Sequence, residues 1–259
     1  MEMKVVFSDF DRTIVDVSKN TLSREQLSIL SKLREKGIIF SVVTGRCLSF
    51  FRENYSELMD VVSYFILSNG SSIYDVSNKH YIYHNFIDSD DLKKIYECAK
   101  RYYLSIYFNL LEGRIRVERG DYQDFGFDKM ACEQVVLSMD SGDSGNLDDL
   151  IREVEQIRGV VISNKGVEPG DGDFFLDINK REVSKGNAVS YLCDYLKFSR
   201  EDAICFGDSD NDMSMFHVVG KRVAVKNASC GIKKNADIVI DSVWEDGVFR
   251  YIDDVFLKN

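Results

Sequence analysis

The chain of 259 residues lacks the cysteine and apolar patterns that mark several classes of protein. None of its six cysteines stands at C-x-x-C spacing, so the sequence signals neither a zinc site nor a redox pair. Most of them lie in apolar segments, as Cys205 does, and we expect buried free thiols. No apolar run approaches the roughly 20 residues that span a bilayer, and the acidic N-terminus does not resemble a signal peptide. The sequence therefore predicts a cytoplasmic protein.

Positive charge is also in deficit. The chain has 33 Lys and Arg residues against 43 Asp and Glu residues, which gives a formal net charge of −10. This balance argues against nucleic acid or an anionic membrane as the partner, because both are themselves negatively charged. It does not exclude a small anionic substrate that is met by a local metal ion. The share of hydrophobic residues, 44%, is that of an ordinary globular chain, and the length suits one large domain or two modest ones.

The first and last parts of the chain alternate between strand and helix signals. The leucines after residue 21 recur at helical spacing, with Ser23 and Gln26 as a capping box and Gly37 as the expected stop. Strand–helix–strand order predicts a doubly wound parallel sheet. Its strands are expected at Val5–Asp9, Ile38–Val43, Tyr64–Leu67, Ala203–Phe206, Val223–Val225 and Ile238–Ile240.

The middle of the chain has closely spaced strands that predict an antiparallel sheet, with helices near Asp90–Tyr102 and Leu147–Arg158. These strands are expected at Tyr81–Phe86, Leu104–Asn109, Arg114–Arg119, Gln134–Met139, Val160–Ser163 and Phe174–Ile178. The predicted fold class is therefore α/β. A Rossmann-like core of residues 1–80 and 183–259 is interrupted by an α+β domain over residues 81–182.

Two aspartates follow the first predicted strand in the segment SDFDRT. Asp9 and Asp11 are two residues apart, so in extended backbone their side chains face the same way. An ionised carboxylate can attack phosphorus, a second carboxyl can give and take a proton, and the pair attracts a hard cation such as Mg²⁺. Alone, the segment also fits an ordinary polar turn.

Two further segments carry groups that suit a phosphate. VVTGR ends the second predicted strand, where the Thr44 hydroxyl and the backbone N–H groups around Gly45 can form a phosphate cradle. Lys185 opens a predicted helix, where its charge opposes the helix macrodipole. An anion in front of the helix explains that placement, and a solvated surface lysine is the simpler alternative.

The segment FGDSDND follows another predicted strand and gathers Asp208, Asp210 and Asp212. Carboxylates this close repel each other unless cations offset their charge, and Gly207 allows close approach of the backbone. An EF-hand is excluded, because the segment lacks the glycine and the glutamate that a calcium loop needs. A Mg²⁺ site shared with SDFDRT fits better.

As an ordered set, these motifs resemble those of the haloacid dehalogenase-like hydrolase superfamily, in particular its Cof-type phosphatases with a large inserted (C2) cap. The match consists of D-x-D-x-T at Asp9–Thr13, the hydroxyl of Thr44, Lys185, and G-D-x-x-x-D at Gly207–Asp212. The long gap before the lysine is where this subgroup carries its cap, which the resemblance assigns to substrate selection. The resemblance is weak over residues 85–175.

The resemblance implies roles for the residues that match the motifs. Asp9 is the expected nucleophile that forms an aspartyl-phosphate, and Asp11 is the expected general acid and base. Thr44 and Lys185 are expected to hold the transferring phosphoryl group. Position 12 departs from the pattern, because Arg12 stands where many relatives have glycine. Its side chain either points to solvent, or it narrows the entrance to the site or adds a contact to the phosphate.

The remaining roles concern the metal and the phosphate. Asp208 is expected to bind Mg²⁺ together with Asp9 and Asp11, the latter through its backbone carbonyl. Asp212 is expected to support the metal or to orient Lys185. Further expected contacts to phosphate or substrate come from Gly45, Arg46, Asn211 and Asn227.

Three functions remain open at this point. The leading one is a Mg²⁺-dependent phosphatase of a small phosphorylated metabolite, such as a sugar phosphate, a nucleotide or a cofactor phosphate. A phosphomutase of the phosphomannomutase-like type shares the same core motifs, because the two differ only in whether water or a sugar hydroxyl accepts the phosphoryl group. A non-catalytic metabolite-binding module is the third. The sequence leaves the oligomeric state open.

Overall fold

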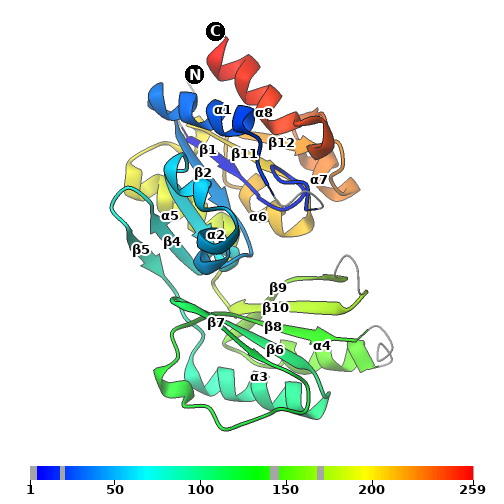
Figure 1. Ribbon diagram of the computed structural model, residues 1–259. Coiled ribbons are helices and arrows are strands. Elements are labelled where there is room, and N and C mark those ends of the chain that lie inside the picture. The colour runs from blue at the N-terminus through cyan, green and yellow to red at the C-terminus, as the bar shows by residue number, and fades with distance from the viewer. Residues whose placement is uncertain (1–4, 18–20, 141–145, 168–171, 259) are drawn as a thin grey trace. The chain divides into compact units, whose positions relative to one another are not determined.

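The computed structural model describes residues 5–17, 21–140, 146–167 and 172–258. The chain divides into two compact units, one formed by residues 1–83 with 184–259 and the other by residues 84–183 (Figure 1). Within the described ranges, no helix combines the length and the apolar character that a membrane span requires.

An eight-stranded sheet runs through the first unit (Figure 1). Its strand order is β13 (Ile238–Ile240), β12 (Lys221–Val225), β11 (Ala203–Gly207), β1 (Val5–Ser8), β2 (Ile39–Val43), β3 (Tyr64–Leu67), β4 (Ser72–Asp75) and β5 (His80–His84). All pairs from β13 to β3 are parallel. Because β1–β3 extend to one side and β11–β13 to the other, the strand order reverses between β1 and β11, which is where open α/β sheets bind ligands.

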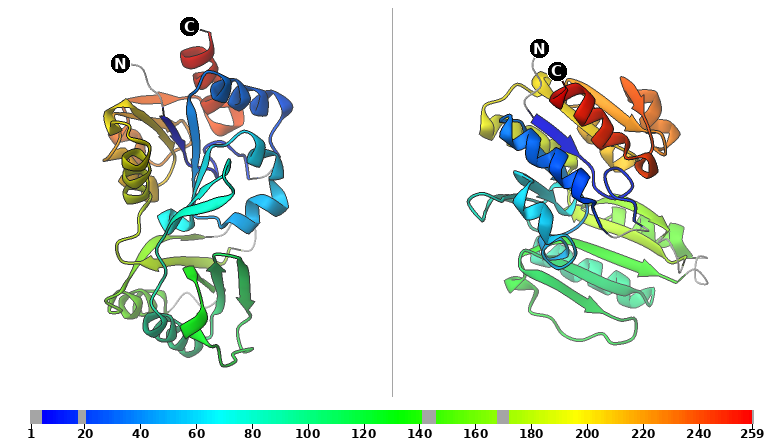
Figure 2. Two further views of the ribbon diagram at one scale, coloured as in Figure 1. Left: turned by 90° about the vertical axis from the view of Figure 1, so that its left-hand side faces the viewer. Right: turned by 45° about the horizontal axis from the view of Figure 1, so that its top comes forward.

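The helices of this unit cover both faces of the sheet. They are α1 (Arg24–Glu35), α2 (Leu48–Asn54), α5 (Lys185–Leu196), α6 (Met213–Phe216), α7 (Cys230–Asn235) and α8 (Gly247–Ile252). Figure 2 shows α1 on one face and α5 on the other. The capping box of Ser23 and Gln26 is confirmed, and Gly37 has the left-handed backbone (φ 73°) expected after the helix end.

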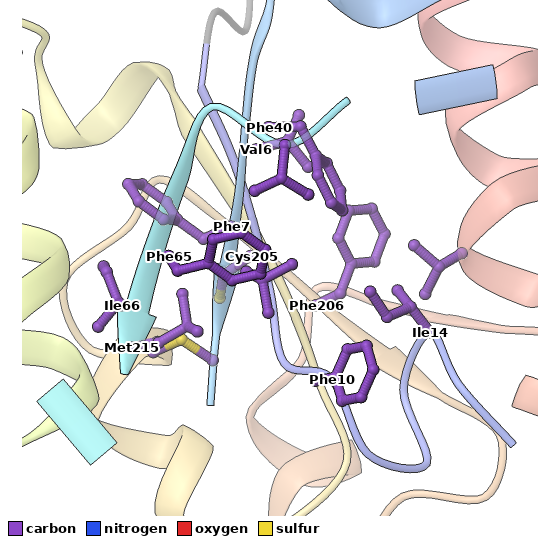
Figure 3. Packing of buried hydrophobic residues seen from close by; sticks show 14 of the residues in the cluster. Val6, Phe7, Phe10, Ile14, Phe40, Phe65, Ile66, Cys205, Phe206 and Met215 are labelled. Atoms are coloured by element: carbon purple, nitrogen blue, oxygen red, sulfur yellow. The ribbon is translucent and has the colours of Figure 1, made fainter. Parts of the chain in front are cut away.

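Large aromatic side chains fill the core between the sheet and its helices. Phe7, Phe40, Phe65 and Phe206 are fully buried and come from four neighbouring strands (Figure 3). Burying a side chain of this size stabilises the fold by about 1.5–3 kcal/mol. The central strands read as continuous apolar runs because helices cover both of their faces.

The sheet differs from the sequence prediction at one edge. The strand predicted at Tyr81–Phe86 was assigned to the antiparallel sheet of the middle domain, whereas β5 is the outer strand of the eight-stranded sheet. Its neighbour β4 was not predicted, and it pairs antiparallel with β3. Alternating hydrophobicity shows that a segment is extended, but it does not say which sheet the segment joins.

The second unit has its own sheet and its own core. Its five strands are antiparallel in the order β7 (Gly113–Val117), β6 (Ser105–Leu110), β8 (Cys132–Met139), β10 (Phe174–Lys180) and β9 (Val160–Val167). Helices α3 (Ser89–Arg101) and α4 (Leu147–Glu155) lie on one face of this sheet (Figure 1). Ile95 of α3 and Val154 of α4 are buried with Phe108 and Leu137 of the sheet in one apolar cluster.

The cysteines are free thiols, and all except Cys230 are buried. Burial, together with a hydrogen bond to Glu153, raises the pKa of Cys98 to about 12, and burial raises the pKa of Cys193 to about 11. Because the thiolate is the reactive form, these buried thiols are chemically inert.

Candidate active site

Three buried carboxylates meet where the strand order reverses. Asp9 follows β1 and Asp208 follows β11, and the Asp9 backbone N–H donates to the carbonyl of Phe206 at 3.0 Å. Asp212 comes from the short turn after β11. Carboxylate oxygens of Asp9, Asp208 and Asp212 all lie within 4.8 Å of one another. Parallel pairing of β1 with β11 therefore gathers two of the predicted motifs into one cluster.

Lys185 supplies the buried positive charge of this cluster. It is the first residue of α5, and its Nζ donates to Asp9 Oδ1 at 2.6 Å and to Asp212 Oδ1 at 2.7 Å. The side chain of Ser184 caps the same helix by accepting from the backbone N–H of Asn187. Burial disfavours the charged lysine, but the carboxylates of Asp212 and Asp9 outweigh it and raise the pKa of Lys185 above its usual value. The anion expected in front of this helix is therefore a pair of carboxylates of the protein itself.

Asp212 uses both carboxylate oxygens within the protein. Oδ1 accepts from Lys185, and Oδ2 accepts from the backbone N–H groups of Asp208 at 2.9 Å and Ser209 at 3.1 Å. Gly207 makes this tight turn possible, since a Cβ at that position would lie 2.7 Å from the Cβ of Asp212. These contacts fix the Asp212 side chain beside Lys185.

Asp208 differs from Asp212 in the hydrogen bonds of its carboxylate. Among the described residues, its buried Oδ2 has no hydrogen-bond partner, and Arg12 Nε lies 3.4 Å from it. Burial and the charge of Asp212 raise the pKa of Asp208 to about 6. The pKa of Asp9 is also raised well above its usual value, by burial and by the neighbouring Asp212 carboxylate, against the opposing effect of Lys185.

The cluster suits a divalent cation. Three buried carboxylates face one buried lysine, so negative charge is in excess. Oδ2 of Asp208, which accepts no hydrogen bond from the described residues, is a hard oxygen donor of the kind that Mg²⁺ prefers. Asp9 and Asp208 are the residues that could hold such an ion, because Asp212 already accepts three hydrogen bonds, from Lys185 and from two backbone N–H groups, whereas Asp9 accepts two.

Asp11 lies outside the cluster of three carboxylates found among the described residues. It is instead held by Arg46, whose Nε donates to Asp11 Oδ2 at 3.0 Å and whose Nη2 donates to Asp11 Oδ1 at 3.1 Å. The guanidinium of Arg46 sits over the ring of Phe50, 4.7 Å from its centroid. The structure therefore brings together two predicted residues, Asp11 and Arg46, as an ion pair.

Arg12 lies in the turn after Asp9, in a backbone conformation that explains the glycine expected at this position. Arg12 has left-handed backbone, with φ 63°, which is the conformation that favours glycine. Its carbonyl accepts from the side-chain amide of Asn227 at 2.8 Å, and the oxygen of that amide accepts from Val243. Asn227 thus braces the turn that carries Asp9 and Asp11.

Thr13 is a site residue to which the sequence analysis assigned no separate role. Its hydroxyl donates to Asp9 Oδ2 at 2.9 Å and lies 3.4 Å from Asp208 Oδ1. Together with Lys185, it fixes both oxygens of Asp9. The signal was present in the sequence, because Thr13 closes the D-x-D-x-T motif.

The segment after β2 joins the segment after β3. Buried Thr44 accepts the backbone N–H of Arg46 on its hydroxyl, and its carbonyl accepts the N–H of Asn69. The Asn69 side chain packs beside Gly45 and accepts from Asn211 at 3.4 Å. Asn69, with left-handed backbone (φ 57°), was not predicted as part of the site; the turn signal Ser-Asn-Gly at the end of β3 marked it.

Comparison with known proteins identifies the family of the chain. A family model described as haloacid dehalogenase-like hydrolase matches residues 6–125 and 126–252. A 5-amino-6-(5-phospho-D-ribitylamino)uracil phosphatase of Bacillus subtilis (strain 168) is 25% identical over 97% of this chain and 95% of its own length. A phosphoglycolate phosphatase of Methanothermobacter thermautotrophicus is 24% identical over 95% of this chain and 96% of its own.

The same fold occurs in solved structures. A haloacid dehalogenase-like hydrolase from Bacteroides thetaiotaomicron superposes with a TM-score of 0.82, at 24% identity, over 98% of this chain and 100% of the other. The chain belongs to the haloacid dehalogenase-like hydrolases, and within them it is a Cof-type phosphatase, an enzyme that hydrolyses phosphoric monoesters.

Proposed function

We propose that the chain is a Mg²⁺-dependent phosphatase that hydrolyses a small phosphorylated metabolite through an aspartyl-phosphate on Asp9. One observation carries this proposal: the Oδ1 atom of a buried carboxylate, Asp9, lies 2.6 Å from the Nζ of a buried lysine, and Asp9 forms one cluster of carboxylates with Asp208 and Asp212. These are the groups that the proposed mechanism needs as nucleophile, cation and metal ligands.

Asp9 and Asp208 would hold the metal, with the backbone carbonyl of Asp11. When bound, Mg²⁺ offsets the charge of the carboxylates and of the transferring phosphoryl group. We assign Asp212 to the orientation of Lys185, because it already accepts three hydrogen bonds, one from Lys185 and two from the backbone. Thr44, Gly45 and Asn211 are proposed to contact phosphate or substrate. Asn227 is proposed to act indirectly, because its hydrogen bond to the Arg12 carbonyl holds the turn that carries Asp9 and Asp11.

The reaction has two half-reactions that share Asp9 and Asp11. In the first, a carboxylate oxygen of Asp9 bonds to phosphorus, the bond from phosphorus to the leaving oxygen breaks, and Asp11 gives that oxygen a proton. In the second, a water oxygen attacks phosphorus and Asp11 takes its proton. The bond to Asp9 then breaks, which releases inorganic phosphate and restores the Asp9 carboxylate. Lys185 stabilises the charge on the phosphoryl group in both steps.

The second unit is proposed to select the substrate. The two phosphatase relatives are named for different substrates at nearly equal identity to this chain, so identity alone does not choose one. On the sheet face opposite α3 and α4, polar side chains are linked across neighbouring strands, with Asn109 donating to Gln134, and both Gln134 and Ser163 donating to Asn179. Asn109, Gln134 and Asn179 are buried, so these bonds link the strands of the unit, and the proposal of substrate selection rests on the unit being a separate domain.

The test is phosphate release from a panel of sugar phosphates, nucleotides and cofactor phosphates, with Mg²⁺ and with excess chelator. We expect release that requires the metal and is concentrated on one chemical class. Release that persists in excess chelator would contradict the metal requirement. A phosphorylated Asp9 without any release of phosphate would indicate a phosphomutase instead.

A further inference from the structure

The pairing of Arg46 with Asp11 is bidentate, and this geometry limits what Asp11 can do. Both carboxylate oxygens accept from one guanidinium, at 3.0 and 3.1 Å. A carboxylate has about four sites that can accept a hydrogen bond, and the two N–H groups of the guanidinium occupy two of them. Two sites remain free to accept a proton. The two hydrogen bonds thus fix the orientation of the Asp11 carboxylate.

Arg46 is itself held by aromatic side chains. Its guanidinium stacks on Phe50, which lies one turn further along at the start of α2. Phe50 packs edge-on against Phe10, with ring centroids 6.2 Å apart, and Phe10 stands between Asp9 and Asp11 in the chain. The same aromatic group therefore supports the two aspartates and the arginine that orients one of them.

We propose that Arg46 is a positioning residue for the second half-reaction: it holds Asp11 as the acceptor of the proton from the water that hydrolyses the aspartyl-phosphate, and Phe50 holds Arg46 in turn. This inference rests on the proposed function. It differs from the sequence expectation, in which Arg46 contacts the phosphate directly. In the second half-reaction the water proton passes to Asp11, the water oxygen bonds to phosphorus, and the electron pair of the broken bond returns to Asp9.

The experiment uses p-nitrophenyl phosphate with the Mg²⁺-loaded enzyme. Its leaving group departs without much help from an acid, so formation of the aspartyl-phosphate depends little on Asp11. Arg46→Ala is expected to lower kcat at least about tenfold, since general base catalysis contributes 10²–10⁴-fold. KM is expected to fall in parallel, which leaves kcat/KM near the wild-type value. A burst of p-nitrophenolate and an acid-stable phosphoprotein should then appear.

Three more variants test whether the effect of Arg46 comes from its two hydrogen bonds to Asp11, from its charge or from its packing. Arg46→Lys keeps the charge but cannot donate the same planar fork, and it should resemble Arg46→Ala. Phe50→Leu keeps an apolar side chain but removes the stacking surface, and it should give the same change to a smaller extent. The matched control is Arg52→Ala, because Arg52 also lies on α2 over an aromatic ring, that of Tyr74 at 5.6 Å. This control should leave all kinetic constants unchanged.

Three results would overturn the inference. A fall in kcat/KM for Arg46→Ala with no burst would show that Arg46 binds the phosphate, and the proposed function would stand. A lowered Tm with proportionate loss of active enzyme in Arg46→Lys would show a merely structural role. A wild-type enzyme that never carries phosphate on Asp9 would contradict both the inference and the proposed function.

Discussion

At the scale of single residues, Asp208 and Asp212 look equivalent in sequence but differ in their bonds. Asp212 is saturated by Lys185 and two backbone N–H groups, whereas Oδ2 of Asp208 has no hydrogen-bond partner within the described residues. An Asp-to-Asn change at either position removes one negative charge. The two changes should nevertheless have different consequences.

We expect Asp208→Asn to weaken Mg²⁺ binding strongly, because it removes the negative charge of a residue that is proposed to hold the metal. Asp212→Asn should weaken binding less and lower kcat, on the order of 10- to 100-fold as for a lost supporting contact, because Lys185 loses a partner. Calorimetric titration of Mg²⁺ into both variants measures the difference. Equal loss of Mg²⁺ affinity in the two variants would contradict this division of roles.

The raised pKa of Asp208 also predicts how the stability of the metal-free protein depends on pH. Its pKa is raised to about 6, above the ordinary value of about 3.9, so between these values the folded state binds more protons than the unfolded state. Its contribution to the free energy of unfolding therefore falls as pH rises through this window. In excess chelator, Asp208→Asn should raise Tm at pH 7, and this gain should shrink at pH 5.

Thermal unfolding of wild type and variant at both pH values is the measurement. Addition of Mg²⁺ should reverse the order at pH 7, because the ion offsets the charge that the variant no longer carries. A gain in Tm that is the same at pH 5 and pH 7 would show that Asp208 does not titrate between these two pH values.

At the scale of elements, two serine caps have similar chemistry but different positions. Ser23 caps α1 and Ser184 caps α5, in each case by accepting a backbone N–H three residues further on. Only α5 begins with a residue of the site, Lys185. The loss of either cap should cost about 1 kcal/mol of stability.

We expect Ser23→Ala to lower Tm with kcat unchanged, and Ser184→Ala to lower both, because the first turn of α5 sets the position of Lys185. Chemical denaturation gives the free energy of unfolding, and steady-state assays give kcat. An unchanged kcat in a destabilised Ser184→Ala protein would show that its ion pairs alone position Lys185.

Local patterns predicted most elements because each has a physical cause within a few residues. The capping box of Ser23 and the stop at Gly37 are such causes, and the apolar runs at the central strands are others. The edge strands β4 and β5 were missed or misassigned, since partner choice depends on distant segments. The same limit applies to the site: the motif residues were visible, but the fork of Arg46 on Asp11 joins positions 35 residues apart.

At the scale of the whole molecule, the two units have separate apolar cores. Every residue of the second buried cluster lies between Ile87 and Ile178, within residues 84–183. Residues 84–183 alone should therefore fold, with a cooperative thermal transition followed by circular dichroism. Absence of a cooperative transition would show that this core depends on the rest of the chain.

The central claim is covalent transfer of the phosphoryl group to Asp9, which accepts from Lys185 and Thr13 and lies within 4.8 Å of Asp208. The most direct measurement is acid quenching of the Mg²⁺-loaded enzyme during turnover, followed by mass spectrometry of its peptides. The account predicts one added phosphoryl group on Asp9. This group should be lost once the substrate is consumed, and it should never form in the Asp9→Asn variant. Steady turnover by Asp9→Asn, or phosphate found on another residue, would contradict it.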